Sequence, residues 1–185
     1  MTHRHTALKA AAVGLTFLTA ASAAHAAQAP EPAKPVNAAT FFTGRWYEIG
    51  RDPQKLTDGC VAGTTDYDPD GKGGVFDHDA CHDQTPQGKA KLLGGPLTIL
   101  NPGQNTKIHI TYQLFGLIPI GRTYWILDHA EGWFIQADPS FTHVNIYTRD
   151  PRPPQALVDQ LTAEVKRLGY TGVLEFPTPF PPGMK

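Results

Sequence analysis

The feature that most constrains the fold of this chain is a series of eight short segments typical of half-buried β-strands. Residues 107–112, KIHITY, alternate apolar and polar side chains, the pattern of a strand with one buried face. Short strands that follow one another closely predict an antiparallel up-and-down sheet, and closing such a sheet removes its unpaired edges. We therefore expect an all-β, eight-stranded antiparallel up-and-down β-barrel, with strands at 45–51, 60–68, 75–82, 88–93, 107–112, 122–128, 133–138 and 144–148.

One helix is predicted after the strands, over residues 154–168. Leu157, Leu161, Val165 and Leu168 recur there at helical spacing, prolines precede the segment, and Gly169 follows it. The apolar stripe is expected to pack against the outside of the barrel. Residues 97–105 are interpreted as a turn-rich connection, and residues 173–176 as a candidate for a final edge strand.

The first 26 residues have the pattern of a signal peptide. A basic start is followed by an Ala-rich apolar run and by the small-x-small sequence Ala24-His25-Ala26. The apolar run is too short for a membrane anchor, and no cysteine for lipidation follows the cleavage site. We expect a soluble periplasmic or secreted protein, with a flexible leader at 27–38, one domain at 39–177 and a Pro-rich tail at 178–185.

Charge and cysteine content narrow the class of protein further. The 185 residues carry 16 basic and 17 acidic side chains, with no block of basic residues, which argues against nucleic acid as a partner. Cys60 and Cys81 lie on either side of the turn at 69–74, so a hairpin would bring them together. In an exported protein a structural disulfide is expected, with a nucleophilic or metal-binding role as the alternatives.

The first strand opens with the short motif Gly44-Arg45-Trp46. The glycine permits a backbone bend or a close approach, and the tryptophan is large enough to fill one end of a closed sheet. Gly-x-Trp alone is weak, because a strand with a core tryptophan is common. Its meaning depends on the segments that follow.

Three separated blocks make the chain resemble a lipocalin from residue 42 to residue 176. The sequence GRWYEI at 44–49 is similar to the first conserved block of that family, DPSF at 138–141 lies where the second does, and NIYTR at 145–149 matches the third. The resemblance is closest to the bacterial lipocalin and apolipoprotein D branch. It implies that Arg149 stacks on Trp46 and closes one end of a ligand cup.

The resemblance also implies a non-enzymatic carrier of a small hydrophobic ligand, of the lipid, fatty acid or lysophospholipid class, with a role in membrane lipid transfer or maintenance. No resident cofactor is expected. A lipocalin-fold enzyme and a module that binds haem or a carotenoid are the alternatives. Strand alternation and the resemblance give these ligand-binding candidates, each of which would equally suit plain core packing: Tyr67, Ile108, Ile110, Tyr112, Trp125, Leu127, Asn145 and Tyr147.

Residues 77–83, DHDACHD, contain several groups that bind metals. Alternation sends 77, 79, 81 and 83 to one face and the two histidines to the other, so the groups do not converge and no metal site is predicted. If Asp77 and Asp79 face inward, they would give the cup a polar or cation-binding patch. No Gly-x-Ser-x-Gly elbow, phosphate-binding loop or zinc-helix motif occurs, which gives catalysis little support.

The loop predicted from Phe115 to Ile120 is unusually apolar for a connection between strands. Four roles suit it: a lid over the mouth of the barrel, a transient membrane contact, a homodimer contact, or packing on its own barrel.

Overall fold

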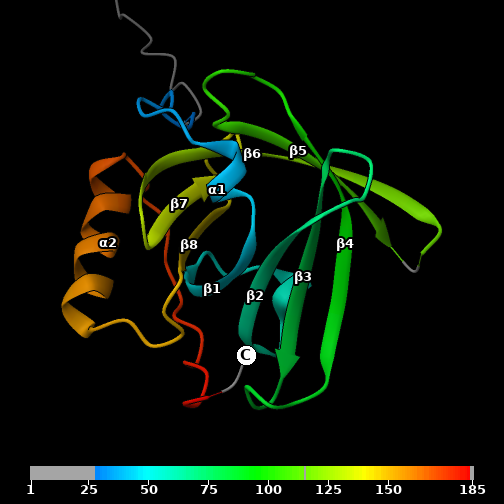
Figure 1. Cartoon of the computed structure of the whole chain (residues 1–185). Helices are drawn as coiled ribbons and strands as arrows, with labels where there is room; N and C mark the ends of the chain where they lie inside the picture. Colours follow the sequence, from blue (N-terminus) through cyan, green and yellow to red (C-terminus); the bar gives the residue numbers. More distant parts are fainter. Residues whose placement is uncertain (1–27, 115, 184–185) are drawn as a thin grey trace, which may run out of the picture.

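The computed structural model describes residues 28–114 and 116–183; the predicted signal peptide lies outside them. It confirms the expected architecture: eight antiparallel strands pair in sequence order, and the last pairs with the first to close a barrel (Figure 1). The strands are β1 Gly44–Arg51, β2 Cys60–Pro69, β3 Val75–Asp83, β4 Ala90–Ile99, β5 Lys107–Leu114, β6 Ile118–Ala130, β7 Trp133–Ala137 and β8 Val144–Thr148.

The single long helix, α2, spans Gln155–Arg167 and packs on the outside of the barrel beside β7 and β8 (Figure 1). Leu161 and Val165 are completely buried in a cluster that includes Ile135 of β7 and Ile146 of β8. The apolar stripe read from the sequence is therefore a packing face. Among the residues described, no helix combines the length and the apolar character that a membrane span needs.

The end of the barrel at the start of β1 is filled by aromatic side chains. Trp46 is 1% exposed and packs with Phe41 and Phe134, at ring-centroid distances of 5.3 and 4.8 Å. The short helix α1, Ala38–Phe41, lies over this end and contributes Phe41. Gly44 has a φ of 61°, in the left-handed region that favours glycine, which gives the first residue of the Gly-x-Trp motif a structural reason. We call this the closed end.

Strand β4 differs from the sequence prediction, because it continues through residues 97–99, which were expected to form a connection. It pairs with β5 only from Leu97 to Ile99, whereas its earlier part pairs with β3 alone. At Gly95 the two strands cross closely: a Cβ atom there would lie 2.0 Å from the carbonyl oxygen of Thr111. The turn-like composition of 94–96, Gly-Gly-Pro, reflects this crossing rather than a strand end.

The predicted loop from Phe115 to Ile120 is wrong as a loop. Ile118 pairs with Leu114 and Ile120 with Tyr112, so most of the segment belongs to a tight β5–β6 hairpin. Leu117 at the tip is 83% exposed, and Ile118 is 54% exposed. Beyond Ile110 this hairpin has no β4 partner, and it projects from the barrel (Figure 1).

The leader and the tail are more closely attached than predicted. Ala29 and Val36 are buried, and the amide of Val36 donates to the carbonyl of Gln104 at 2.8 Å. In the tail, Phe180 is buried against Tyr47 and His82. The candidate edge strand at 173–176 is reduced to one bridge between Arg51 and Glu175. Few apolar anchors were visible in these segments, yet one or two suffice to hold each of them.

Candidate ligand-binding site

A cavity of about 680 Å³ lies inside the barrel. This volume is in the range of small-molecule sites, which is roughly 300–1,000 Å³. The strand pairing fixes which side chains reach it: Thr65 lies opposite Asp79 and Tyr67 opposite Asp77, so all four share the inner face. The apolar part of the lining includes Leu93, Ile110, Leu114 and Ile120, and the aromatic part is Tyr67, Tyr112, Tyr124 and Tyr147.

The structure brings together most of the predicted ligand-binding residues. Tyr67, Ile110, Tyr112, Asn145 and Tyr147 line the cavity. A sixth candidate, Ile108, is completely buried in the core cluster at the closed end, and it lies outside the cavity lining.

The predicted inward orientation of Trp125 and Leu127 is wrong. Both side chains lie on the outer face of β6, in the cluster that α2 covers, and Lys107 lies 3.8 Å from the Trp125 ring centroid. Tyr124 and Ile126 take the inner face instead. The reason is that this part of β6 is buried on both sides, by the barrel interior and by the outer apolar cluster to which α2 contributes. When both faces of a strand are buried, apolar residues occupy both faces, so the sequence does not show which residues point into the barrel.

The closed end is held by Arg149, as the family resemblance implied. Its guanidinium carbon lies 3.6 Å from the centroid of the Trp46 ring. The same group donates to the carbonyls of Arg45 and Phe41, at 2.8 and 3.4 Å. A planar cation over an indole face, with its N–H groups given to backbone carbonyls, satisfies both partners in a buried setting.

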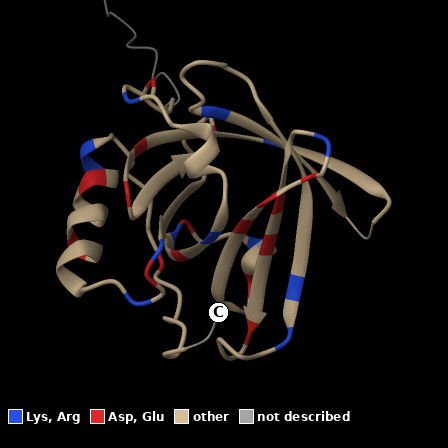
Figure 2. Ribbon diagram, in the orientation of Figure 1, with Lys and Arg blue, Asp and Glu red and all other residues tan. Residues whose placement is uncertain are grey.

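The polar part of the cavity is dominated by two aspartates of β3 (Figure 2 shows the acidic positions along this strand). Asp79 accepts hydrogen bonds from the hydroxyls of Thr65 and Tyr112, the latter at 2.8 Å. Asp77 is 1% exposed, and neither of its carboxylate oxygens has a hydrogen-bond partner among the described residues. This confirms the inward orientation that the sequence left open, while His78 between them points outward and is half exposed.

Burial controls the protonation of these groups. It raises the pKa of Asp77 well above its usual value, and the neighbouring charge of Asp79 raises it further. The pKa of Asp79 is also raised, because burial outweighs its hydrogen bonds from Thr65 and Tyr112. Burial raises the pKa of each of the four cavity tyrosines as well, so these remain neutral hydroxyls.

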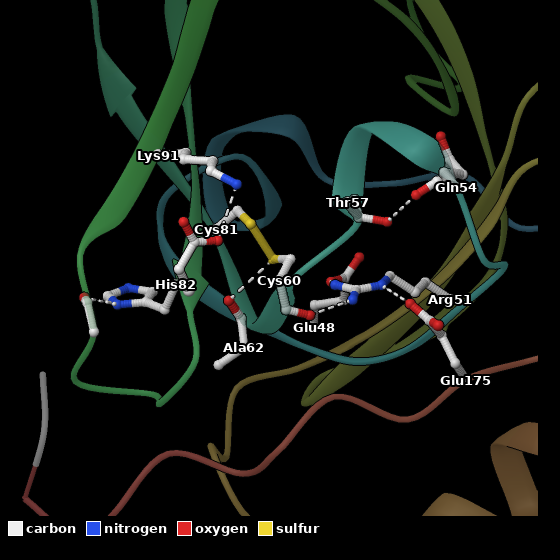
Figure 3. Close-up of a disulfide and its surroundings, with 12 residues drawn as sticks. Glu48, Arg51, Gln54, Thr57, Cys60, Ala62, Cys81, His82, Lys91 and Glu175 are labelled. Carbon is white, nitrogen blue, oxygen red and sulfur yellow. Dashed lines mark hydrogen bonds and ion pairs between the residues drawn. A yellow bond between two sulfur atoms is a disulfide. The ribbon is translucent and has the colours of Figure 1, made fainter.

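A third buried carboxylate, Glu48 of β1, is balanced by a cation. Arg51 donates to Glu48 at 2.7 Å, to Glu175 at 2.6 Å and to the carbonyl of Cys60 at 2.6 Å. Figure 3 shows this cluster beside the disulfide that joins Cys60 and Cys81, whose Cα atoms lie 5.4 Å apart. The predicted disulfide is confirmed. A β-bulge before Ala62 offsets Cys60, so it lies opposite Asp83.

Sequence reasoning missed Tyr124, Gln136 and Glu48 as members of the cavity lining. Tyr124 was missed because the inner and outer faces of β6 were predicted the wrong way round. Glu48 was missed because it lies within a family motif and was considered only as part of it. Gln136 lies on β7, opposite Asn145, and its side-chain oxygen is buried without a partner in the described part of the chain. No group of three or more His, Cys, Asp or Glu side chains within residues 28–114 and 116–183 is arranged to hold a metal ion.

Comparisons with known proteins agree with this architecture. The family profile described as a lipocalin-like domain matches residues 38–179. Insecticyanin from the tobacco hornworm Manduca sexta has a TM-score of 0.63 at 17% identity, over 82% of this chain and 85% of that one. Lobster apocrustacyanin A1 has a TM-score of 0.54 at 15% identity, over 83% and 92%.

The amine-binding protein of Rhodnius prolixus, in its tryptamine complex, has a TM-score of 0.55 at 12% identity, over 79% of this chain and 84% of that one. At these identities the structural likeness shows the fold alone. A comparison with curated protein sequences finds no match.

Proposed function

The chain belongs to the family of lipocalin-like domains, and from that premise we propose that it is a non-enzymatic carrier of a small, largely apolar ligand. The observation that carries the proposal is the cavity of about 680 Å³ inside the barrel. Its apolar and tyrosine lining would gain roughly 25 cal/mol for each Å² of apolar surface that a ligand buries, before ordering is subtracted. The solved relative from Rhodnius prolixus is itself an amine-binding protein.

Within this function, the lining favours some lipid-like ligands over others. An acyl or aromatic group suits Leu93, Ile110 and the tyrosines. A fatty acid suits the site poorly, because its carboxylate would enter beside Asp77 and Asp79 and repel them. We therefore propose ligands with a neutral or positively charged polar group, which includes zwitterionic lysophospholipids that present the ammonium group of the head to the two aspartates.

We further propose that the protein is exported to the periplasm or secreted and that it serves membrane lipid transfer or maintenance, as the bacterial and apolipoprotein D branch of the family would. The signal-peptide pattern and the disulfide support export. Near the mouth, Leu92, Leu117 and Ile118 are exposed apolar side chains. They support a transient contact with a membrane or a second copy during ligand transfer.

The enzymatic alternative loses its proposed nucleophile. The sequence contains two cysteines, and both form the disulfide, so neither presents a thiolate. The haem or carotenoid alternative would show itself as a visible absorbance band in the protein purified from its source.

Blocking the cavity tests the carrier function. We expect the purified protein to bind the neutral fluorophore N-phenyl-1-naphthylamine, and Leu93→Trp to weaken this binding by at least about tenfold, because the indole fills the cavity. Thr98→Trp is the matched control: it places the same side chain at an exposed position of β4 that is not part of the lining. Equal affinity in the two variants would show that the ligand does not bind inside the barrel.

A further inference from the structure

The buried polar atoms of the cavity that lack a partner are all hydrogen-bond acceptors. Both oxygens of Asp77 lack a partner among the described residues, and so does the side-chain oxygen of Gln136; both residues line the cavity. Buried acceptors without donors are uncommon in folded proteins, because each loses its hydration without compensation. The cavity therefore lacks hydrogen-bond donors for its buried acceptor atoms.

The charged groups around the cavity are also unbalanced, with acidic side chains that have no basic partner. Glu48 is paired with Arg51 at 2.7 Å, and Lys91 with Asp83 at 3.0 Å. Arg122, the other basic side chain in the lining, is exposed, and within the described residues its guanidinium donates one hydrogen bond, to the carbonyl of Gly121. Asp77 and Asp79 have no cationic partner within the described ranges, which leaves two carboxylates facing a tyrosine-lined space.

We propose that the ligand carries a positively charged ammonium group, which binds at Asp79 and Asp77 while its apolar part occupies the tyrosine-lined cavity. This deepens the carrier function proposed above and rests on it. Asp79 is the contact group, because it is partly accessible and its hydrogen bonds from Thr65 and Tyr112 fix its orientation. Asp77, the neighbouring inward-facing residue of β3, adds two carboxyl oxygens that have no partner in the described structure, and an adjacent ammonium group would favour its ionised form.

An ammonium group matches the site better than the alternatives. It offers up to three donors and no acceptor, which is what a cavity of unpartnered acceptors needs. The four tyrosine rings add faces to which a cation is attracted. A bare metal ion is a poorer match, since two carboxylates give too few ligands and no third group converges on them. A neutral alcohol supplies one donor and no positive charge to favour the ionised form of either carboxyl group.

Three probes that share a phenyl ring and a four-carbon chain separate these cases: 4-phenylbutylamine, 4-phenylbutan-1-ol and 4-phenylbutyrate. By calorimetry at pH 7.5, we expect the amine to bind at least about tenfold more tightly than the alcohol, as a charge-assisted hydrogen bond in a buried site implies, and the carboxylate to bind most weakly. The wild-type comparison requires no variant to fold.

Variants then assign the effect to the two residues. Asp79→Asn should weaken amine binding by at least about tenfold and leave alcohol binding within about twofold, and Asp77→Asn should act in the same direction but less. Asp68→Asn is the matched control, because it removes one carboxylate from an exposed position of β2. It should change neither affinity.

The outcomes distinguish the two proposals. If the alcohol binds as tightly as the amine, or if Asp77→Asn/Asp79→Asn retains the amine preference, the ammonium site is refuted while the carrier function stands. If neither these probes nor N-phenyl-1-naphthylamine binds, the carrier function itself fails. A tenfold amine preference that Asp79→Asn abolishes and Asp68→Asn keeps establishes the site.

Discussion

The two ends of the barrel treat charged side chains in opposite ways. At the closed end, Arg149 lies over Trp46 and gives its N–H groups to two backbone carbonyls. In the cavity, Asp77 is buried to a similar degree as Trp46, and its carboxylate has no partner in the described structure. The first arrangement stabilises the fold, and the second lowers its stability in the absence of a ligand.

This contrast indicates that different residues contribute to folding stability and to ligand affinity. Groups that are satisfied within the chain contribute to folding, whereas groups left unsatisfied contribute only when a ligand arrives. Substitutions at the closed end should therefore change stability with little effect on affinity. Substitutions at Asp77 and Asp79 should change affinity, and substitution of the unpartnered Asp77 should raise the stability of the ligand-free protein.

The largest expected effect is that of Trp46→Ala. Truncating this buried indole should lower the free energy of unfolding by about 3–5 kcal/mol, measured by chemical denaturation, because it leaves a cavity among Phe41 and Phe134. Trp46→Phe keeps an aromatic ring in place, so its free energy of unfolding should fall by less. If Trp46→Ala instead abolished binding of N-phenyl-1-naphthylamine at full stability, the division between the two ends would be wrong.

Arg149→Ala should lower the free energy of unfolding by about 1–3 kcal/mol, because a cation–π contact and two hydrogen bonds are lost. Arg149→Lys keeps the charge but loses the planar group, so most of the loss should remain. Thermal denaturation alongside a binding titration checks this. A binding defect with unchanged melting temperature is the result that contradicts it.

Asp77→Asn should stabilise the ligand-free protein at pH 8, by roughly 1–2 kcal/mol, because it removes a buried charge that has no partner. Denaturation of the variant and of Asp68→Asn, side by side, measures the difference. The exposed control should stay within about 0.5 kcal/mol of wild type. A destabilised Asp77→Asn would mean that a partner absent from this structure satisfies the carboxylate.

The pH dependence of stability follows from the same residue. The folded-state pKa of Asp77 is raised above its unfolded value, so between these two values the folded protein holds a proton that the unfolded chain has lost. The contribution of Asp77 is therefore complete below about pH 4 and declines as the pH rises, by at most about 1.4 kcal/mol per pH unit.

Ligand-free protein unfolded at pH 4, 5, 6, 7 and 8 tests this. The advantage of Asp77→Asn over wild type should grow as the pH rises above the unfolded-state pKa of about 4, and it should become constant once the pH exceeds the folded-state pKa. The carboxyls of Asp70, Asp128 and Asp138 have lowered pKa values, so their contributions are lost only as the pH falls below about 4 and do not disturb the comparison. An advantage of Asp77→Asn that is the same at pH 4 and at pH 8 would refute the raised pKa.

The smallest expected effect on binding is that of Trp125→Ala. The side chain lies outside the barrel, in the outer apolar cluster to which α2 contributes, so the affinity for N-phenyl-1-naphthylamine should change by less than about twofold even though stability falls. Tyr124→Ala, one residue earlier and on the cavity side, is the matched comparison and should weaken binding more. The reverse order would mean that Trp125 reaches the ligand.

The alternation of side chains made most of the barrel predictable, and the spacing of Cys60 and Cys81 about a turn made their disulfide predictable. The choice of inner face was harder. On β6 both faces are apolar, so the sequence pattern could not distinguish Tyr124 from Trp125 as the residue that faces the cavity. On β3 the pattern separated Asp77 and Asp79 from His78, but the usual preference of charge for solvent suggests the opposite of what the structure has.

The crossing of β4 and β5 at Gly95 has a mechanical consequence. Of the strand pairs of the barrel, β4 and β5 share the fewest paired residues: three, against four for β1 and β8 and eight for β3 and β4. We call the β4–β5 pairing the joint. Deformation of the ring should concentrate at that joint, and the aspartates of β3 lie on one side of it while the hydroxyl of Tyr112 lies on the other. A ligand that pushes β4 and β5 apart would therefore lengthen the hydrogen bond from Tyr112 to Asp79. Because that hydrogen bond lowers the pKa of Asp79, widening of the cavity is expected to raise this pKa.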